Sequence, residues 1–242
     1  MATRLYMPLS TAPSTVWAGI MTTNPAFAAF GSTTGMLRRM LVPQAVAGDY
    51  AAYIDALGNG GAISTVTPGS SQGHVQLISI PMRAGNAFTT ATTFKLQIMG
   101  LESAVNDNVI NRVRAVRIFS RDGSTVQSTQ IALGNATSVV EWSTTSTNLS
   151  FLTGQTGANY TTVAGDRLVV DLGSLDSGGA TISTTLRRGV TGQSADLGEN
   201  ETDTTTTLRP WFETSLTLTF EDERILPDVA NLSQALGRAA IW

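Results

Sequence analysis

The chain has 242 residues, of which 42% are hydrophobic, so it can bury a sizeable core and is not a disordered chain. Charged residues make up only 14%, the formal net charge is −3, and Lys95 is the only lysine, which excludes the dense basic surface that nucleic acid binding requires. The lack of cysteine excludes a disulfide framework and a thiolate metal site.

Residues 1–73 contain no clean alternating run and are predicted to form an extended N-terminal arm with short elements. The prolines at positions 8, 13, 25 and 43 interrupt regular structure there. Residues 48–57 are predicted to form a short helix or turn that ends at a cluster of glycines, and residues 64–73 a loop. The N-terminus lacks the pattern of a secretory signal, and no segment reaches the ~20 apolar residues of a membrane helix. We therefore expect no contact with a membrane.

From His74 onward, strand patterns recur at the spacing of an all-β domain. The predicted strands are residues 74–81, 93–101, 109–120, 125–133, 139–143, 148–152, 167–173, 180–186 and 209–220. Turns are predicted at residues 121–123 and 176–179, where Asp and Gly occur together. The sequence therefore predicts an all-β fold, an antiparallel jelly-roll-like β-sandwich over residues 74–220.

The last predicted strand has the clearest alternation. One face carries Phe212, Thr214, Leu216, Leu218 and Phe220, and the other carries Glu213, Ser215, Thr217 and Thr219. Because successive side chains of a strand point to opposite faces, we expect the first set to be buried and the second to face solvent, a neighbouring sheet or another subunit.

The C-terminal tail, residues 221–242, changes character. Its apolar residues have helical spacing, and it ends in Ile241 and Trp242. We expect a short helical tail that packs on the chain's own sandwich or on a neighbouring subunit.

A nucleophile motif is formally present. Residues 69–73 read Gly-Ser-Ser-Gln-Gly, and the only histidine, His74, follows directly. A nucleophile elbow requires a strand before the serine and a helix after it, whereas here a loop precedes and a strand follows. We therefore expect no catalytic role and interpret His74 as a strand-edge residue.

Four carboxylates, Asp196, Glu199, Glu201 and Asp203, lie within eight residues. Flexible carboxylate loops can bind calcium, but this spacing is not that of an EF-hand. The pattern favours a solvated acidic loop over an ion site.

Two further groupings have possible functional meanings. Glu141 and Glu213 are the strand glutamates that a glycosidase could use, although nothing in the sequence pairs them. Trp17, Trp142 and Trp211 could stack on a sugar, but tryptophan in a sandwich more often fills the core or an interface. We expect no enzyme and assign no catalytic, cofactor-binding or metal-binding residues, and no cofactor.

Several blocks of sequence resemble a known group of proteins. They are residues 76–82 (QLISIPM), 121–125 (RDGST), 165–173 (GDRLVVDLG) and 210–213 with 219–220 (PWFE and TF). In order and spacing, over about residues 74–220, they are similar to a poorly characterised family of virion proteins from tailed bacteriophages and prophages. The resemblance implies a structural role in the virion and supplies no catalytic residues.

The sequence therefore predicts a capsid decoration or cement protein that binds the major capsid protein or other virion proteins and stabilises the head surface. Few charges, the proline-rich arm and the apolar C-terminus favour assembly into a homo-oligomer such as a trimer, made in the cytoplasm of a bacterial host. The alternative is a tail, neck or fibre component that binds host carbohydrate. Left open are head or tail location, copy number and symmetry, the host, a bound glycan or calcium ion, and whether the arm or the tail is the anchor.

Overall fold

The structure is a computed structural model, and it describes residues 2–7, 37–43, 61–66, 71–102, 104–105, 111–135, 141–175, 182–187, 195–205 and 208–221. The helix or turn predicted at residues 48–57, the turn at residues 176–179, the helix in the tail and Trp17 lie outside these ranges. Every regular element of the described residues is a strand, which confirms the predicted all-β fold.

The strands follow in chain order. They are β1 (Thr3–Tyr6), β2 (Leu37–Pro43), β3 (Gly61–Val66), β4 (Ser71–Ser79), β5 (Ala87–Phe88), β6 (Thr93–Glu102), β7 (Asn111–Phe119), β8 (Val126–Asn135), β9 (Thr147–Thr156), β10 (Tyr160–Thr161), β11 (Arg167–Leu175), β12 (Ile182–Arg187) and β13 (Trp211–Thr214).

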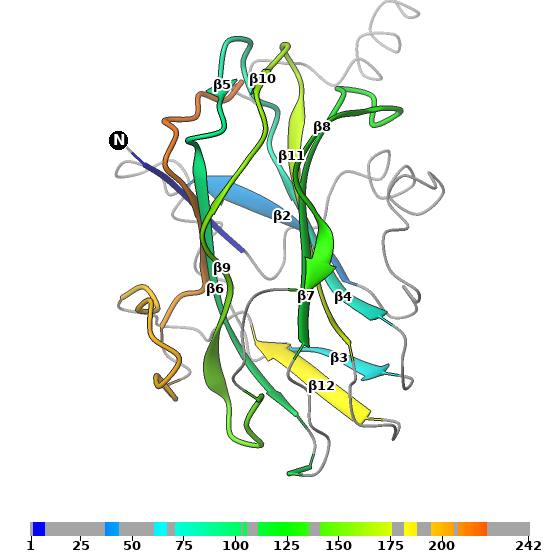
Figure 1. The fold of residues 1–242 in the computed structure, drawn as a ribbon, viewed down its shortest axis with the longest axis vertical. Coiled ribbons are helices and arrows are strands. Elements are labelled where there is room, and N and C mark those ends of the chain that lie inside the picture. The colour runs from blue at the N-terminus through cyan, green and yellow to red at the C-terminus, as the bar shows by residue number, and fades with distance from the viewer. Residues whose placement is uncertain are drawn as a thin grey trace, which may run out of the picture.

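These strands build a β-sandwich. Their hydrogen-bonded order is β3-β12-β6-β13-β1-β2-β4-β11-β7-β8, with β9 on the other edge of β6, and β5 and β10 form a separate pair. Pairing is antiparallel except between β2 and β4. Figure 1 shows β6 and β9 on one side and β4, β7, β8 and β11 on the other, and we call these the β6 layer and the β11 layer. The strands β1 and β2 join the two layers, and β3 lies against β4.

The main core lies between the layers. From β6 it takes Phe94, Leu96 and Ile98, and from β11 it takes Leu168, Val170 and Leu172. These residues occupy alternate positions of the predicted strands 93–101 and 167–173, so the two-residue period of a strand accounts for the buried face of both.

The β11 layer is also buried on its second face. Ile78 of β4, Phe119 of β7 and Val169 of β11 alternate with core residues and form a second apolar cluster there. Strands buried on both faces are apolar at successive positions, as residues 168–170 are.

The N-terminal segment is part of the sheet rather than only an arm. Residues 3–6 pair with β13 on one side, and Leu5 and Tyr6 pair with β2 on the other. The predicted loop at residues 64–73 is likewise strand at both ends, in β3 and β4. Strands that lack an alternating pattern form here because tertiary neighbours satisfy their backbone groups.

Two predicted strands differ from those observed. Residues 141–143 are not in a strand, although Trp142 is buried. The strand predicted over residues 209–220 is regular only at Trp211–Thr214. Beyond it, the Thr214 and Thr3 hydroxyls accept hydrogen bonds from the backbone N–H groups of Leu216 and Leu218, in place of ladder partners.

The predicted burial of that segment is nevertheless correct. The side chains of Phe212, Thr214 and Leu218 are buried, Leu216 and Phe220 pack against the main core, and Ser215, Thr217 and Thr219 are exposed.

Candidate functional site

The densest network of charged side chains lies on the outer face of the β6 layer, where residues 195–205, called here the acidic segment, cross β1, β13 and β6. In register across these strands, Arg4 stands opposite Glu213, and Glu213 opposite Lys95. Arg4 donates to Glu213 from Nε at 3.0 Å and from Nη2 at 2.7 Å. Opposite charges in directly opposed positions stabilise strand pairing.

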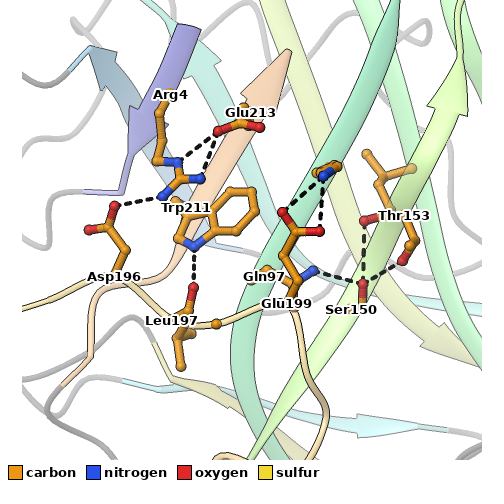
Figure 2. Close-up of polar contacts among 12 residues, drawn as sticks. Arg4, Gln97, Ser150, Thr153, Asp196, Leu197, Glu199, Trp211 and Glu213 are labelled. Carbon is orange, nitrogen blue, oxygen red and sulfur yellow. Dashed lines mark hydrogen bonds and ion pairs between the residues drawn. The ribbon is translucent and has the colours of Figure 1, made fainter. Parts of the chain in front are cut away.

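Asp196 connects the acidic segment to this face. It accepts hydrogen bonds from Arg4 Nη1 at 2.8 Å and from the Tyr6 hydroxyl at 2.9 Å, and Arg209 Nε lies 3.3 Å from its other oxygen. Figure 2 shows Arg4 between Asp196 and Glu213, with Trp211 beside it. Burial, together with the bond to Asp196, raises the pKa of the Tyr6 hydroxyl, which therefore stays protonated and acts as the donor.

An apolar contact, at a position between the charged residues of the acidic segment, also holds the segment on the sandwich. Leu197 packs with Tyr6, Met99 and Trp211 in a small cluster on the outer face. The Trp211 Nε1–H donates to the Leu197 carbonyl at 2.6 Å, so this buried indole has its hydrogen bond satisfied by the segment (Figure 2). The Arg4 guanidinium lies 3.9 Å above the Trp211 ring, a cation–π geometry.

Further along, the segment follows the free edge of β9. Asn148 N–H donates to the Asp203 carbonyl at 2.8 Å, and Asn148 Nδ2 donates to the Gly198 carbonyl at 2.8 Å. Ser150 N–H donates to the Glu201 carboxylate at 3.2 Å. The segment therefore satisfies backbone donors that β9 cannot pair with β6.

A buried ion pair links the segment to the opposite layer. Arg112 of β7, whose side chain has no solvent exposure, pairs with Glu201 and donates to the Ser150 carbonyl at 3.0 Å. Lys95 and Glu199 form a second pair, with 2.9 Å from Nζ to each carboxylate oxygen, but both side chains are partly exposed and the contact is weaker.

The prediction of a solvated acidic loop is therefore wrong for Asp196 and Glu201, whose side chains are mostly shielded by their partners, whereas Glu199 is exposed as predicted. Asp196, Glu199 and Glu201 are each paired with cations, and Asp203 accepts from Asn200 Nδ2 at 3.2 Å. Within the part of the chain that the structure describes, no group of three or more acidic or histidine side chains is placed to hold a metal ion.

His74 is not a strand-edge residue. Its side chain is fully buried, and Nε2 lies 2.7 Å from Ser174 Oγ and 2.9 Å from Thr184 Oγ1. The pairing of β4 with β11 shifts register beside it, so His74 is the extra residue of a β-bulge. Burial lowers the pKa of His74 to about 3, so the imidazole is neutral and its hydrogen bonds join β4, β11 and β12.

The other candidate residues do not converge. β4 begins at Ser71, so no strand-turn-helix elbow forms around the nucleophile motif. The backbone near Glu141 lies beside Glu102, because Glu102 N–H donates to the Ser143 carbonyl, whereas Glu213 lies opposite Lys95. Seven residues of β6 separate those two positions, roughly 23 Å, far beyond the separation of glycosidase carboxylates.

A buried polar group on the second face of the β11 layer was not anticipated. Gln76 Nε2 donates to Asp171 at 2.5 Å, and Arg117 donates to the other Asp171 oxygen at 2.6 Å. Asp171 and Gln76 are fully buried. An aspartate inside the apolar run of residues 168–172 was the available signal, since a buried carboxylate requires a cationic partner.

Comparison with known proteins does not assign the chain to a family. No known protein family matches the chain, and neither does any curated protein sequence. One similar solved structure is a selenomethionine-labelled α-amino acid ester hydrolase, at 13% identity and a TM-score of 0.34, over 59% of this chain and 25% of that one. Another is that of infectious bursal disease virus, Gt strain, at 13% identity and a TM-score of 0.30, over 98% of this chain and 65% of that one. Both matches are too weak to carry an argument about function.

The chain thus spans a quarter of the hydrolase and just under two thirds of the virus protein. The class that the structure defines is an antiparallel β-sandwich protein. Nowhere do the described residues form a helix long and apolar enough to cross a membrane.

Proposed function

We propose that the chain is a structural protein of a tailed-bacteriophage virion, and specifically a decoration or cement protein that binds the major capsid protein at the head surface. The observation that carries the proposal is the use of its charged side chains. In the described residues, the carboxylates of the acidic segment and the cations that face them fasten the segment to the sandwich. A protein that uses its ionisable groups to hold its own shape suits a structural role better than a chemical one.

The blocks that carry the family resemblance support the same proposal. Residues 76–79 lie in β4, residues 167–173 in β11 and residues 211–213 in β13, and residues 121–125 form the turn between β7 and β8. All of these positions build the sandwich rather than a set of converging reactive groups. A resemblance confined to scaffold positions fits a family whose members share a shape.

The exposed surface is compatible with assembly. Exposed side chains at residues 127, 129, 143–145, 202, 204 and 205 are hydroxyl or amide groups without charge. A surface of this kind approaches a neighbouring subunit without a large cost for removing charges from water. We propose a closed homo-oligomer such as a trimer as the unit that binds the head.

The alternative, a tail, neck or fibre component that binds host carbohydrate, has less support. Trp142 and Trp211, two of the three tryptophans considered for a sugar platform, are each 1% exposed. Neither can stack on a ligand in this conformation.

The decisive experiment is the copy number of the chain in purified particles, measured by quantitative mass spectrometry against the major capsid protein. A decoration protein should approach the copy number of the capsid protein. A value far below it would refute the decoration role and favour the tail, neck or fibre. Absence from particles would refute the virion role altogether, and binding on a glycan array would favour the carbohydrate module.

A further inference from the structure

Among the strands of the described residues, β9 has a neighbour on one edge only, which is β6. It forms a backbone ladder with β6, and no other strand of the described residues forms a ladder with it. Such an edge presents backbone N–H and C=O groups that can pair with a strand from another molecule. Proteins usually cover, twist or charge these edges.

Only one half of β9 is regular enough to serve as a template. Thr147, Asn148, Leu149 and Ser150 pair with β6 without interruption, whereas the register shifts twice between Ser150 and Gln155. A bulge disrupts the ladder locally and bends the strand, so the second half is a poor template. The edge strand β8, by comparison, has three register shifts against β7 along its length.

The acidic segment lies against the regular half. The backbone N–H groups of Asn148 and Ser150 donate to Asp203 and Glu201 of the segment, at 2.8 Å and 3.2 Å. The contact therefore coincides with the four residues that another strand could use.

Besides the segment, Arg112 of β7 reaches this edge and donates to the Ser150 carbonyl at 3.0 Å, but the sequence of β9 adds no protection of its own. Residues 147–156 read Thr-Asn-Leu-Ser-Phe-Leu-Thr-Gly-Gln-Thr and include no charge and no proline. Two copies of this strand would meet in antiparallel order without repulsion between like charges. A second copy of the chain is also the partner that is always present at an equal concentration.

We propose that the acidic segment is an intramolecular edge cover, which occupies the regular half of β9 and prevents it from pairing with β9 of a second copy. This inference does not rest on the proposed virion role. It gives the acidic segment a role in preventing self-association, which is different from ion binding and from a solvated loop.

The test uses a variant that loosens the cover from outside the strands. In Gly198→Val, the added side chain begins at a Cβ only 2.8 Å from Asn200 Nδ2, so the Asn200 side chain must move. Asn200 Oδ1 accepts from the backbone N–H groups of Thr202 and Asp203, both at 3.0 Å, so this displacement loosens the turn that contacts Asn148. Thr204→Ala, at an exposed position of the same segment, is the matched control. Glu201→Ala, which removes the acceptor of Ser150 N–H, is the second releasing variant, with circular dichroism to confirm folding.

Two measurements decide the outcome. Hydrogen exchange in dilute solution should be at least about tenfold faster at the amides of Asn148 and Ser150 in the releasing variants. For the releasing variants, light scattering after size exclusion should give at least twice the mass of the wild type when both are measured at the same high concentration. Adding Ser150→Pro removes the N–H that points away from β6. It keeps the backbone ladder with β6, although the side-chain bond from Gln97 is lost, and it should restore the wild-type mass.

The control Thr204→Ala must keep the wild-type exchange rates at Asn148 and Ser150 and the wild-type mass. Exposed amides with an unchanged mass in either folded variant would overturn the proposal. So would a rise in mass that Ser150→Pro does not reverse, because that rise would come from another surface. The proposal would also be overturned if neither releasing variant had a higher mass than the wild type.

Discussion

The single histidine makes the stability of the fold depend on pH in a way that can be isolated. His74 is fully buried, and its pKa falls from 6.5 in the unfolded chain to about 3 because burial disfavours the charged imidazolium. A base whose pKa is lowered by folding contributes its full stability above the unfolded pKa. That contribution is lost as the pH falls from 6.5 toward 3, since the unfolded chain binds the proton first.

The size of the effect follows from the pKa. Each unit of pH between the two values costs about 1.4 kcal/mol. Between pH 8 and pH 5 only the 1.5 units below 6.5 count, so the free energy of unfolding should fall by about 2 kcal/mol from His74 alone. Complete titration would correspond to about 5 kcal/mol, which is comparable to the whole stability of many domains.

The assay compares the wild type with His74→Gln by urea unfolding at pH 8, 7, 6 and 5. The variant has no titrating group at this position, and the carboxylates common to both proteins cancel in the difference. The stability advantage of the wild type should shrink by about 2 kcal/mol over this range. A difference that stays constant, or an imidazole that titrates near 6.5 by NMR in the folded state, would refute the reasoning.

Three substitutions test other contacts, each by urea unfolding at neutral pH. Asn86→Ala removes a buried amide that bonds to both the N–H and the carbonyl of Thr219, and should cost about 3 kcal/mol; a cost below 1 kcal/mol would contradict this role. Gly157→Ala places a Cβ against the buried Gln130 side-chain oxygen and 2.7 Å from the buried Phe94 ring, and should cost about 2 kcal/mol, whereas a neutral effect would show that both side chains can move. Trp211→Phe leaves the Leu197 carbonyl without its donor and should cost about 2 kcal/mol, with faster exchange in the acidic segment, and unchanged exchange would show that the bond does not hold it.

Much of the sandwich was predictable because the order of apolar and polar residues within a strand indicates which of its faces is buried. The alternation at Phe94, Leu96 and Ile98, and again at Leu168 and Val170, is set by the two-residue period of a strand and needs no knowledge of its neighbours. The turn at residues 121–123 was predictable for a similar reason, since Gly123 has a φ of 68°, which glycine adopts at little cost.

The sequence indicated which carboxylates belong to the candidate site, but not what they bind. The four carboxylates of the acidic segment stand together in the sequence, but the cations that pair with them lie in distant parts of the chain. Arg4 is 192 residues from Asp196, and Arg112 is 89 residues from Glu201. No local period relates residues so far apart, and a carboxylate looks solvated until the partner that replaces its water is known.

His74 shows the same limit within a single strand. The sequence placed His74 where a loop meets a strand, whereas β4 already begins at Ser71 and His74 is the extra residue of a bulge that exists only in the pairing with β11.

The sequence by itself therefore determined the all-β class and, from β4 onward, most of the longer strands and their apolar faces, because each depends on neighbours within a few residues. The tertiary structure decided the pairing of β1 with β13, the buried position of His74 and the docking of the acidic segment on β9. Those features depend on which distant backbone and side-chain groups meet. The contacts among these groups stabilise the fold only after the two layers have packed together.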